Sequence, residues 1–255
     1  MKVAYLIMAY SPDHYYRRLC NVDWQDYPDA DKVVILLHQR EHLTGEFPLP
    51  LKHDFDFKVV EINIEGEWPA LWGRKLWAGV DAAMNEKCEA IVWFDEDDEY
   101  HPAWTKTLVG FLNEGYDIAW TWMNRDVKKS HIKLGHYDAP SGAMIVRTAV
   151  AKIAADRHKQ QYPLGKRHAT AVGSMDLTYC KLILKQPGVR LKEFNLPKKM
   201  NRFYPRHKHA NTKHRLYSED IDACFDYSKA TVKQDVPQVP KVRNADYLRK
   251  RMEKA

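Results

Sequence analysis

The stretch Ile91-Val92-Trp93-Phe94-Asp95-Glu96-Asp97-Asp98-Glu99-Tyr100 is an apolar run that ends abruptly in five acidic residues. Its apolar half has the length of a buried strand, and parallel sheets bind ligands beyond the carboxyl ends of their strands. Adjacent carboxylates repel one another, and this repulsion destabilises the folded protein unless a positive charge lies among them. We therefore expect a divalent cation, Mg²⁺ or Mn²⁺, which would neutralise a substrate diphosphate. The alternative is a solvated turn that caps a helix beginning near Pro102.

Short apolar runs alternate with amphipathic stretches over the first 120 residues, as in βαβ units around a mainly parallel sheet. We expect strands at residues 3–9, 32–37, 57–62, 90–94, 118–123 and 142–147. Helices are expected around residues 16–22, 71–86, 149–157 and 175–184. The sequence thus predicts the α/β class.

The chain has 255 residues, of which 45% are hydrophobic, enough to bury one α/β core. The apolar run at residues 3–10 is too short to span a membrane, and the four cysteines form no disulfide framework. We therefore expect a soluble protein with no membrane partner, in a bacterial cytoplasm or that of a virus-infected cell. From residue 181 onward, 19 Lys and Arg face 8 Asp and Glu. This basic end suits a polyanion or a phosphate-bearing ligand, and a solvated surface is the plainer alternative.

Several short segments carry a family resemblance. The segment from Trp72-Gly73-Arg74 to Asp98 resembles the part of family 2 glycosyltransferases where a Gly-initiated helix precedes a strand ending in Asp-x-Asp. The opening strand at residues 3–10 resembles that of GT-A enzymes, whose Rossmann-like, mostly parallel sheet is flanked by helices. The resemblance covers residues 1–215 and implies a transferase domain that uses a nucleotide-diphosphate sugar. Residues 216–255 are predicted to be a basic extension with a Pro-containing linker and a short helix.

The resemblance also implies a metal site. Asp95 would contact the nucleotide ribose or the metal, and Asp97 would be the principal metal ligand. Asp98 is the alternative ligand, because the register of the motif within the acidic run is open. His207 and His209 are further candidate ligands.

Donor contacts are expected at residues that follow strand ends, start a helix, or carry positive charge for the leaving diphosphate. These are Tyr10, His38, Arg74, Asp95 and Arg206. The sequence His38-Gln39-Arg40-Glu41 departs from the turn with which the family commonly reads the nucleobase. This departure leaves the nucleobase of the donor open, and a UDP-sugar remains the default expectation.

The segment Gly173-Ser174-Met175-Asp176-Leu177 matches the place where inverting family members carry their catalytic base at a helix start. An inverting transfer needs a base that takes the proton of the acceptor hydroxyl. Asp176 is the candidate. The alternative is a structural acid favoured by the helix dipole.

Residues 198–215 hold seven Lys or Arg, three His and no acid, interleaved with aromatic residues. Such a pattern can follow a phosphate backbone and stack bases, so the acceptor could be DNA with a hydroxymethylated pyrimidine. Candidate acceptor or nucleic-acid contacts are Trp122, Ser141, Gly142, Lys198, Lys199, Arg202 and Lys208. Most other tryptophans are expected in the core.

Other functions remain open at this point. The acceptor could be a small molecule, a glycan or a protein. A metal-dependent nucleotidyltransferase or nuclease would use the same acids, and a non-catalytic nucleic-acid-binding module would use only the basic end. The sequence does not indicate the oligomeric state.

Overall fold

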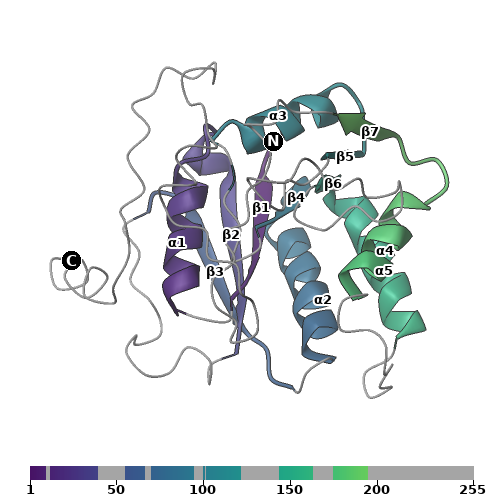
Figure 1. Cartoon of the computed structure of the whole chain (residues 1–255), viewed down its shortest axis with the longest axis horizontal. Helices are drawn as coiled ribbons and strands as arrows, with labels where there is room; N and C mark the ends of the chain where they lie inside the picture. The colour runs from purple at the N-terminus through teal and green to yellow at the C-terminus, as the bar shows by residue number, and fades with distance from the viewer. Residues whose placement is uncertain are drawn as a thin grey trace, which may run out of the picture.

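A computed structural model of the chain describes residues 1–9, 12–39, 55–66, 70–94, 100, 102–121, 144–162 and 175–194. These residues form one sheet with helices on both faces (Figure 1). The strands are β1 (Val3–Met8), β2 (Lys32–His38), β3 (Lys58–Asn63), β4 (Ala90–Trp93), β5 (Ile118–Thr121), β6 (Met144–Arg147) and β7 (Leu191–Phe194). The helices are α1 (Pro12–Asp23), α2 (Ala70–Asn85), α3 (Trp104–Asn113), α4 (Thr148–Gln161) and α5 (Met175–Leu184), with a 3-10 turn, η1 (Asp29–Asp31).

The strand order is β3-β2-β1-β4-β6-β5-β7. Strands β1 to β4 are mutually parallel, and β7 is parallel to β5. Strand β6 is antiparallel to both of its neighbours, β4 and β5. Among the strands that the structure describes, β6 is thus the one that runs against the others, so the sheet is mostly parallel.

Continuous apolar strands are buried on both faces, as central strands of a parallel sheet must be. Along β1, Ala4 and Leu6 join the core beneath α2, α4 and α5. Between them, Tyr5 and Ile7 join the core beneath α1 and α3. The alternation follows from the two-residue period of a strand. The result is a three-layer arrangement with the sheet in the middle.

Most predicted elements are confirmed, with small shifts at their ends. Strand β4 ends at Trp93, and α3 begins at Trp104 rather than near Pro102. Strand β7 was not predicted. Four tryptophans expected in the core are buried there: Trp77, Trp93, Trp104 and Trp120. The predicted C-terminal extension lies outside the described residues.

Helix α2 approaches the sheet closely at Gly79. A Cβ atom there would lie 2.8 Å from Leu37 Cδ1 and 3.2 Å from Leu6 Cδ1. Both leucines are buried, so their side chains have little room to move. The glycine is therefore what lets α2 pack directly on β1 and β2.

We expect Gly79→Ala to lower the free energy of unfolding by about 0.5–2 kcal/mol. Overpacking costs about 1–3 kcal/mol, and the better helix propensity of Ala offsets about 0.5–1 kcal/mol of this. Gly110→Ala, in α3, is the matched control. Apart from the backbone of its own helix, no atom of the described residues lies within 4 Å of its Cβ position, so this change should stabilise by about 0.5–1 kcal/mol. Urea unfolding measures both, and equal effects in the two variants would contradict the close approach.

Candidate active site

The carboxyl ends of four parallel strands meet at one edge of the sheet, called here the carboxyl edge. Backbone hydrogen bonds continue the ladder just past the strands, from Ala9 N to Leu37 O and from Phe94 N to Leu6 O, both 2.9 Å. From β1 the chain adds β2 and then β3 on one side, and it places β4 on the other side of β1, so the order in which strands are added reverses between β1 and β4. A crevice at such a reversal is where open α/β sheets bind ligands. The acidic run begins at Asp95, directly after Phe94 at this point.

Two stacked aromatic rings bracket the acidic run. Phe94 precedes it and Tyr100 follows it, and their ring centroids lie 3.9 Å apart with planes 11° from parallel. Both residues are buried, and Tyr5 packs edge-on against Phe94 at 5.1 Å. The chain therefore leaves and re-enters the core at nearly the same place. The two residues that flank the acidic run in the sequence, Phe94 and Tyr100, are therefore held against each other.

Asn21 of α1 holds the second of these residues. Its Oδ1 accepts a hydrogen bond from Tyr100 N, and its Nδ2 donates one to Tyr100 O, both at 3.0 Å. Arg18 donates from Nη1 to the same Oδ1 at 3.1 Å, and its guanidinium lies 5.9 Å from the centre of the Tyr100 ring. Arg18 is fully buried. Helix α1 thus brings both a two-bond clamp and a positive charge to Tyr100, the residue that follows the acidic run.

Asn21→Ala is expected to lower the free energy of unfolding by about 1–3 kcal/mol. The change removes the acceptor of the buried Tyr100 N–H, and an unsatisfied group of this kind costs about 1–3 kcal/mol, whereas Tyr100 O still accepts from Gln25 Nε2 at 3.4 Å. Lys106→Ala is the control in the same region. It removes an exposed ion pair with Asp26 (2.8 Å), which is worth about 0–1 kcal/mol. The free energy of unfolding of both variants is measured by urea unfolding. A loss in Asn21→Ala no larger than the loss in Lys106→Ala would contradict the role of Asn21 in holding Tyr100.

The ends of β2 and β3 meet the start of α2 beside this site. Ile64 N donates to His38 O (2.9 Å), and Gln39 Nε2 donates to Gly66 O (2.8 Å). Arg74 Nη1 donates to Glu65 O at 2.8 Å. The structure therefore brings together two predicted donor contacts, His38 and Arg74, through residues 64–66. His38 is 4% exposed and Arg74 is half-buried.

Gly66 is the residue that lets Arg74 reach this backbone. Its φ is +141°, and a Cβ atom there would lie 2.9 Å from Arg74 Nη1. A side chain at this position would both strain the backbone and displace the guanidinium. The turn after β3 thus needs a glycine to seat Arg74.

Lys75 was not predicted as a site residue. It is fully buried, and its Nζ donates to Ala9 O at 3.1 Å, where β1 ends. A lysine amine therefore lies inside the protein at the end of β1, the strand next to β4. The signal in the sequence is a lysine on the apolar stripe of α2, between Leu71 and Leu76.

The topology directs the first turn of α5 toward the same edge. Strand β7 begins at Leu191 opposite Ile118, the first residue of β5, so its start lies at the amino edge of the sheet. Residues 185–190 connect α5 to β7 over a short distance. Helix α5 therefore ends near the amino edge, and its opposite end, with Asp176, lies toward the carboxyl edge (Figure 1).

Many predicted site residues lie outside the part of the chain that the structure describes. They are Tyr10, Asp95, Asp97, Asp98, Trp122, Ser141, Gly142, Lys198, Lys199, Arg202, Arg206, His207, Lys208 and His209. Their roles stay predictions. Among the described residues, no three His, Cys, Asp or Glu are grouped closely enough to hold a metal ion. The same residues include no helix with the length and hydropathy needed to cross a membrane.

Comparisons with known proteins give matches at the level of structure. No protein-family profile and no curated protein matches the sequence. TarS of S. aureus, a GT-A glycosyltransferase, matches as the fragment 1-349, with TM-score 0.54 and 17% identity over 80% of this chain and 60% of that one. The same fragment in complex with UDP-GlcNAc matches with TM-score 0.54 and 16% identity, over 88% of this chain and 64% of that one. The fragment in complex with UDP matches with TM-score 0.52 and 15% identity, over 88% of this chain and 63% of that one.

The chain therefore spans less than two thirds of the solved chains that it matches. At this identity the likeness concerns the fold. The seven-stranded, mostly parallel sheet, the helices on both faces and these matches together confirm the fold class predicted from the sequence. The chain has a GT-A-like fold.

Proposed function

We propose that this chain is a glycosyltransferase that moves a sugar from a nucleotide-diphosphate donor to an acceptor hydroxyl. One observation carries the proposal. Five acidic residues follow β4 in the sequence, at the point where the strand order reverses, and the residues that flank them, Phe94 and Tyr100, stack on each other. This is the place where an open α/β sheet binds its ligand.

A UDP-sugar is the proposed donor. Support comes from the GT-A-like fold and from the TarS structures, which were solved in complex with UDP-GlcNAc and with UDP. Arg74, His38 and Lys75 gather polar and positive groups around the ends of β1, β2 and β3. Positive charge there would favour a diphosphate. Arg206 is proposed to add charge for the leaving group.

Asp97 and Asp95 are proposed to hold Mn²⁺ or Mg²⁺, with His207 or His209 as further ligands. Carboxylate oxygens in succession match the preference of these hard cations. When bound, the ion would stabilise the negative charge of the diphosphate. Asn21 holds the backbone of Tyr100, the residue that follows the acidic run, and the buried Arg18 adds positive charge beside Tyr100.

Asp176 is proposed as the base of an inverting transfer. Its carboxylate would take the acceptor proton as the hydroxyl oxygen bonds to the anomeric carbon and the nucleoside diphosphate leaves. The direction of α5 supports this role, because the first turn of the helix lies toward the carboxyl edge. General base catalysis of this kind contributes roughly 10² to 10⁴ in rate.

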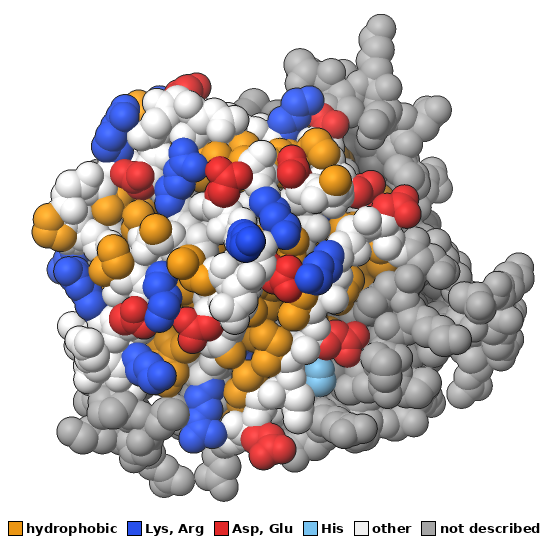
Figure 2. All heavy atoms as spheres, turned by 180° about the vertical axis from the view of Figure 1, so that it is seen from behind, with side chains coloured by type: hydrophobic (Ala, Val, Ile, Leu, Met, Phe, Trp, Pro, Cys, Tyr) orange, Lys and Arg blue, Asp and Glu red, His pale blue; other side chains and the backbone are white. Residues whose placement is uncertain are grey.

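DNA bearing a hydroxymethylated pyrimidine is the proposed acceptor. Support comes from the basic and aromatic residues 198–215. On the face shown in Figure 2, the Lys and Arg of the described residues are interspersed with Asp and Glu, in contrast to the composition of residues 198–215. A polyanion would therefore be held by the C-terminal part of the chain. Trp122, Ser141 and Gly142 are proposed to line the acceptor side.

Thermal-shift measurements with UDP, GDP, CDP and TDP, each with and without Mn²⁺, test the donor. A bound ligand stabilises by mass action, about 2.7 kcal/mol at a hundredfold excess over its Kd. We expect UDP with Mn²⁺ to give the largest shift. Release of UDP from UDP-sugars, with hydroxymethylated and plain DNA as acceptors, then tests transfer, and mass analysis of the nucleosides identifies the product.

The rival functions give different results in these assays. A nuclease would leave UDP-sugars intact and cut the DNA. A non-catalytic binding module would retain DNA and turn over no donor. Transfer of the sugar to a small molecule, a glycan or a protein instead of DNA would support the transferase activity and reject DNA as the acceptor. No shift with any nucleotide and no donor turnover would reject the proposed function.

A further inference from the structure

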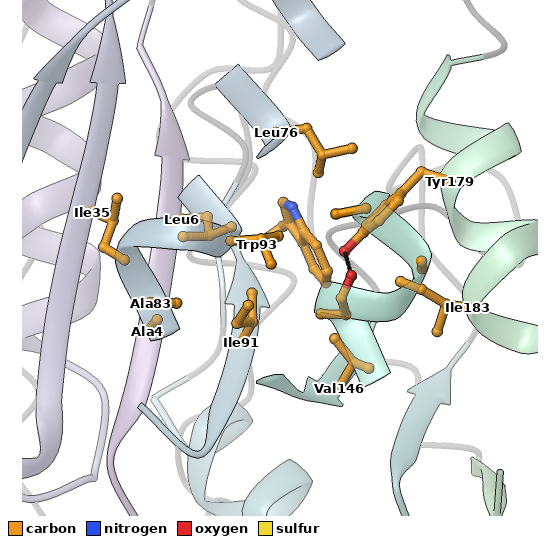
Figure 3. Close-up of a cluster of buried hydrophobic side chains, with 14 of the residues drawn as sticks. Ala4, Leu6, Ile35, Leu76, Ala83, Ile91, Trp93, Val146, Tyr179 and Ile183 are labelled. Carbon is orange, nitrogen blue, oxygen red and sulfur yellow. Dashed lines mark hydrogen bonds between the residues drawn. The ribbon is translucent and has the colours of Figure 1, made fainter. Parts of the chain in front are cut away.

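Strand β4 is held on both faces where the acidic run begins. Phe94 packs toward α1 and α3, whereas its neighbour Trp93 points to the opposite face, toward α2, α4 and α5. There the ring of Tyr179 meets Trp93 edge-on, with centroids 5.7 Å apart and planes at 70° (Figure 3). Both side chains are buried. Among the described residues, the indole N–H of Trp93 finds no hydrogen-bond partner, and the ring is held there by packing.

Tyr179 is itself firmly anchored. Its hydroxyl donates to Ala151 O of α4 at 3.1 Å, the bond drawn in Figure 3. Its ring also lies edge-on to His158 of α4, at 6.2 Å. His158 in turn accepts a hydrogen bond at Nδ1 from Trp77 Nε1 of α2 (3.2 Å). Burial lowers the pKa of His158 to about 4, so this imidazole is neutral at pH 7. Tyr179 is thus fixed by α4, which is tied to α2.

The Trp93–Tyr179 contact joins two segments that carry candidate site residues. Trp93 lies two residues before Asp95, the first acid of the run. Tyr179 lies three residues after Asp176, about one helical turn along α5. A change at this contact would alter how the first turn of α5 sits relative to the acidic run. Displacements of about 1 Å can cost on the order of a hundredfold in rate.

We propose that Tyr179 is a positioning residue that sets the placement of the base Asp176 against the donor site at the end of β4. The inference rests on the proposed glycosyltransferase function and deepens it. Tyr179 touches neither donor nor acceptor in this scheme. Its aromatic ring acts through Trp93, and its hydroxyl holds α5 against α4.

Steady-state kinetics of three full-length variants test this role. Tyr179→Leu removes the ring. We expect kcat to fall about tenfold to a hundredfold, while the KM for the UDP-sugar and the Mn²⁺-dependent shift with UDP stay within about twofold. Tyr179→Phe keeps the ring and loses only the hydroxyl, so it should retain kcat within about threefold. Should Tyr179→Leu fail to fold, Tyr179→Met replaces it.

Ile183→Ala is the matched control, because Ile183 lies one turn further along α5 and is fully buried in the same core (Figure 3). We expect it to lower the Tm at least as much as Tyr179→Leu and to leave kcat unchanged. Wild-type kcat in Tyr179→Leu, or an equal loss of kcat in Ile183→Ala, would overturn the positioning role. Wild-type protein that turns over no nucleotide sugar would instead reject the function itself, and the inference with it.

Discussion

Asp176→Asn should lower kcat by roughly 10² to 10⁴ while UDP still binds in the presence of Mn²⁺. Asparagine has nearly the same shape, and it cannot take the proton of an attacking hydroxyl. The loss should therefore appear in the transfer step, with the KM for the donor nearly unchanged. Release of UDP during transfer measures kcat, and the thermal shift with UDP and Mn²⁺ measures donor binding separately.

Asp156→Asn is the control for this prediction. Asp156 lies on α4 and pairs with Lys152 at the surface, where its side chain is 52% exposed. Exposed pairs of this kind contribute little, so kcat and stability should stay near the wild-type values. An Asp176→Asn enzyme that keeps more than about a tenth of its kcat would show that the base is another residue.

Strands β1, β2 and β4 could be predicted from the sequence because of their burial. Central parallel strands are covered on both faces, so they are written as continuous apolar runs such as Val3 to Ala9. Strand β7 was missed for the converse reason. Among the described strands it lies at the edge of the sheet and pairs only with β5, and its first residue, Leu191, is 37% exposed. A short strand of this kind needs no apolar run.

The reversed direction of β6 could not be predicted either. Alternation of side chains along a strand is the same whichever way the strand runs. The sequence therefore identified the apolar residues of Met144–Arg147 and gave no signal that this strand opposes β4. Direction depends on the path of the chain between β5 and β6, which local pattern does not encode.

Polar groups that support the candidate site were the least predictable. Asn21 and Tyr100 are 79 residues apart, and nothing local in either segment points to the other. Lys75 gave a clearer signal, since a lysine on an apolar helix face needs a buried partner. Its partner, the carbonyl of Ala9, lies 66 residues away and required the fold. The acids of the proposed site were visible because they are adjacent in sequence.

Asp97→Ala is expected to remove the Mn²⁺-dependent part of the UDP thermal shift and to lower kcat on the order of 10³-fold. A metal ion supplies several kcal/mol of charge stabilisation in the transition state, and each 1.36 kcal/mol is tenfold in rate. Calorimetric titration with Mn²⁺ in the presence of UDP measures the loss of binding. Asp81→Ala is the control. Asp81 is a 54% exposed acid of α2 that pairs with Lys152, and its removal should leave binding and rate unchanged.

The neighbouring variant Asp98→Ala fixes the register of the acidic run. Alternate side chains of an extended segment point to opposite sides, so Asp95 and Asp97 would share a side that Asp98 does not. A large loss in Asp97→Ala with a small one in Asp98→Ala supports the Asp95–Asp97 pair. The reverse result would shift the ligand by one residue and keep the metal site. If neither change weakens UDP binding or turnover, the acids only cap the segment before α3, and the donor must be held without them.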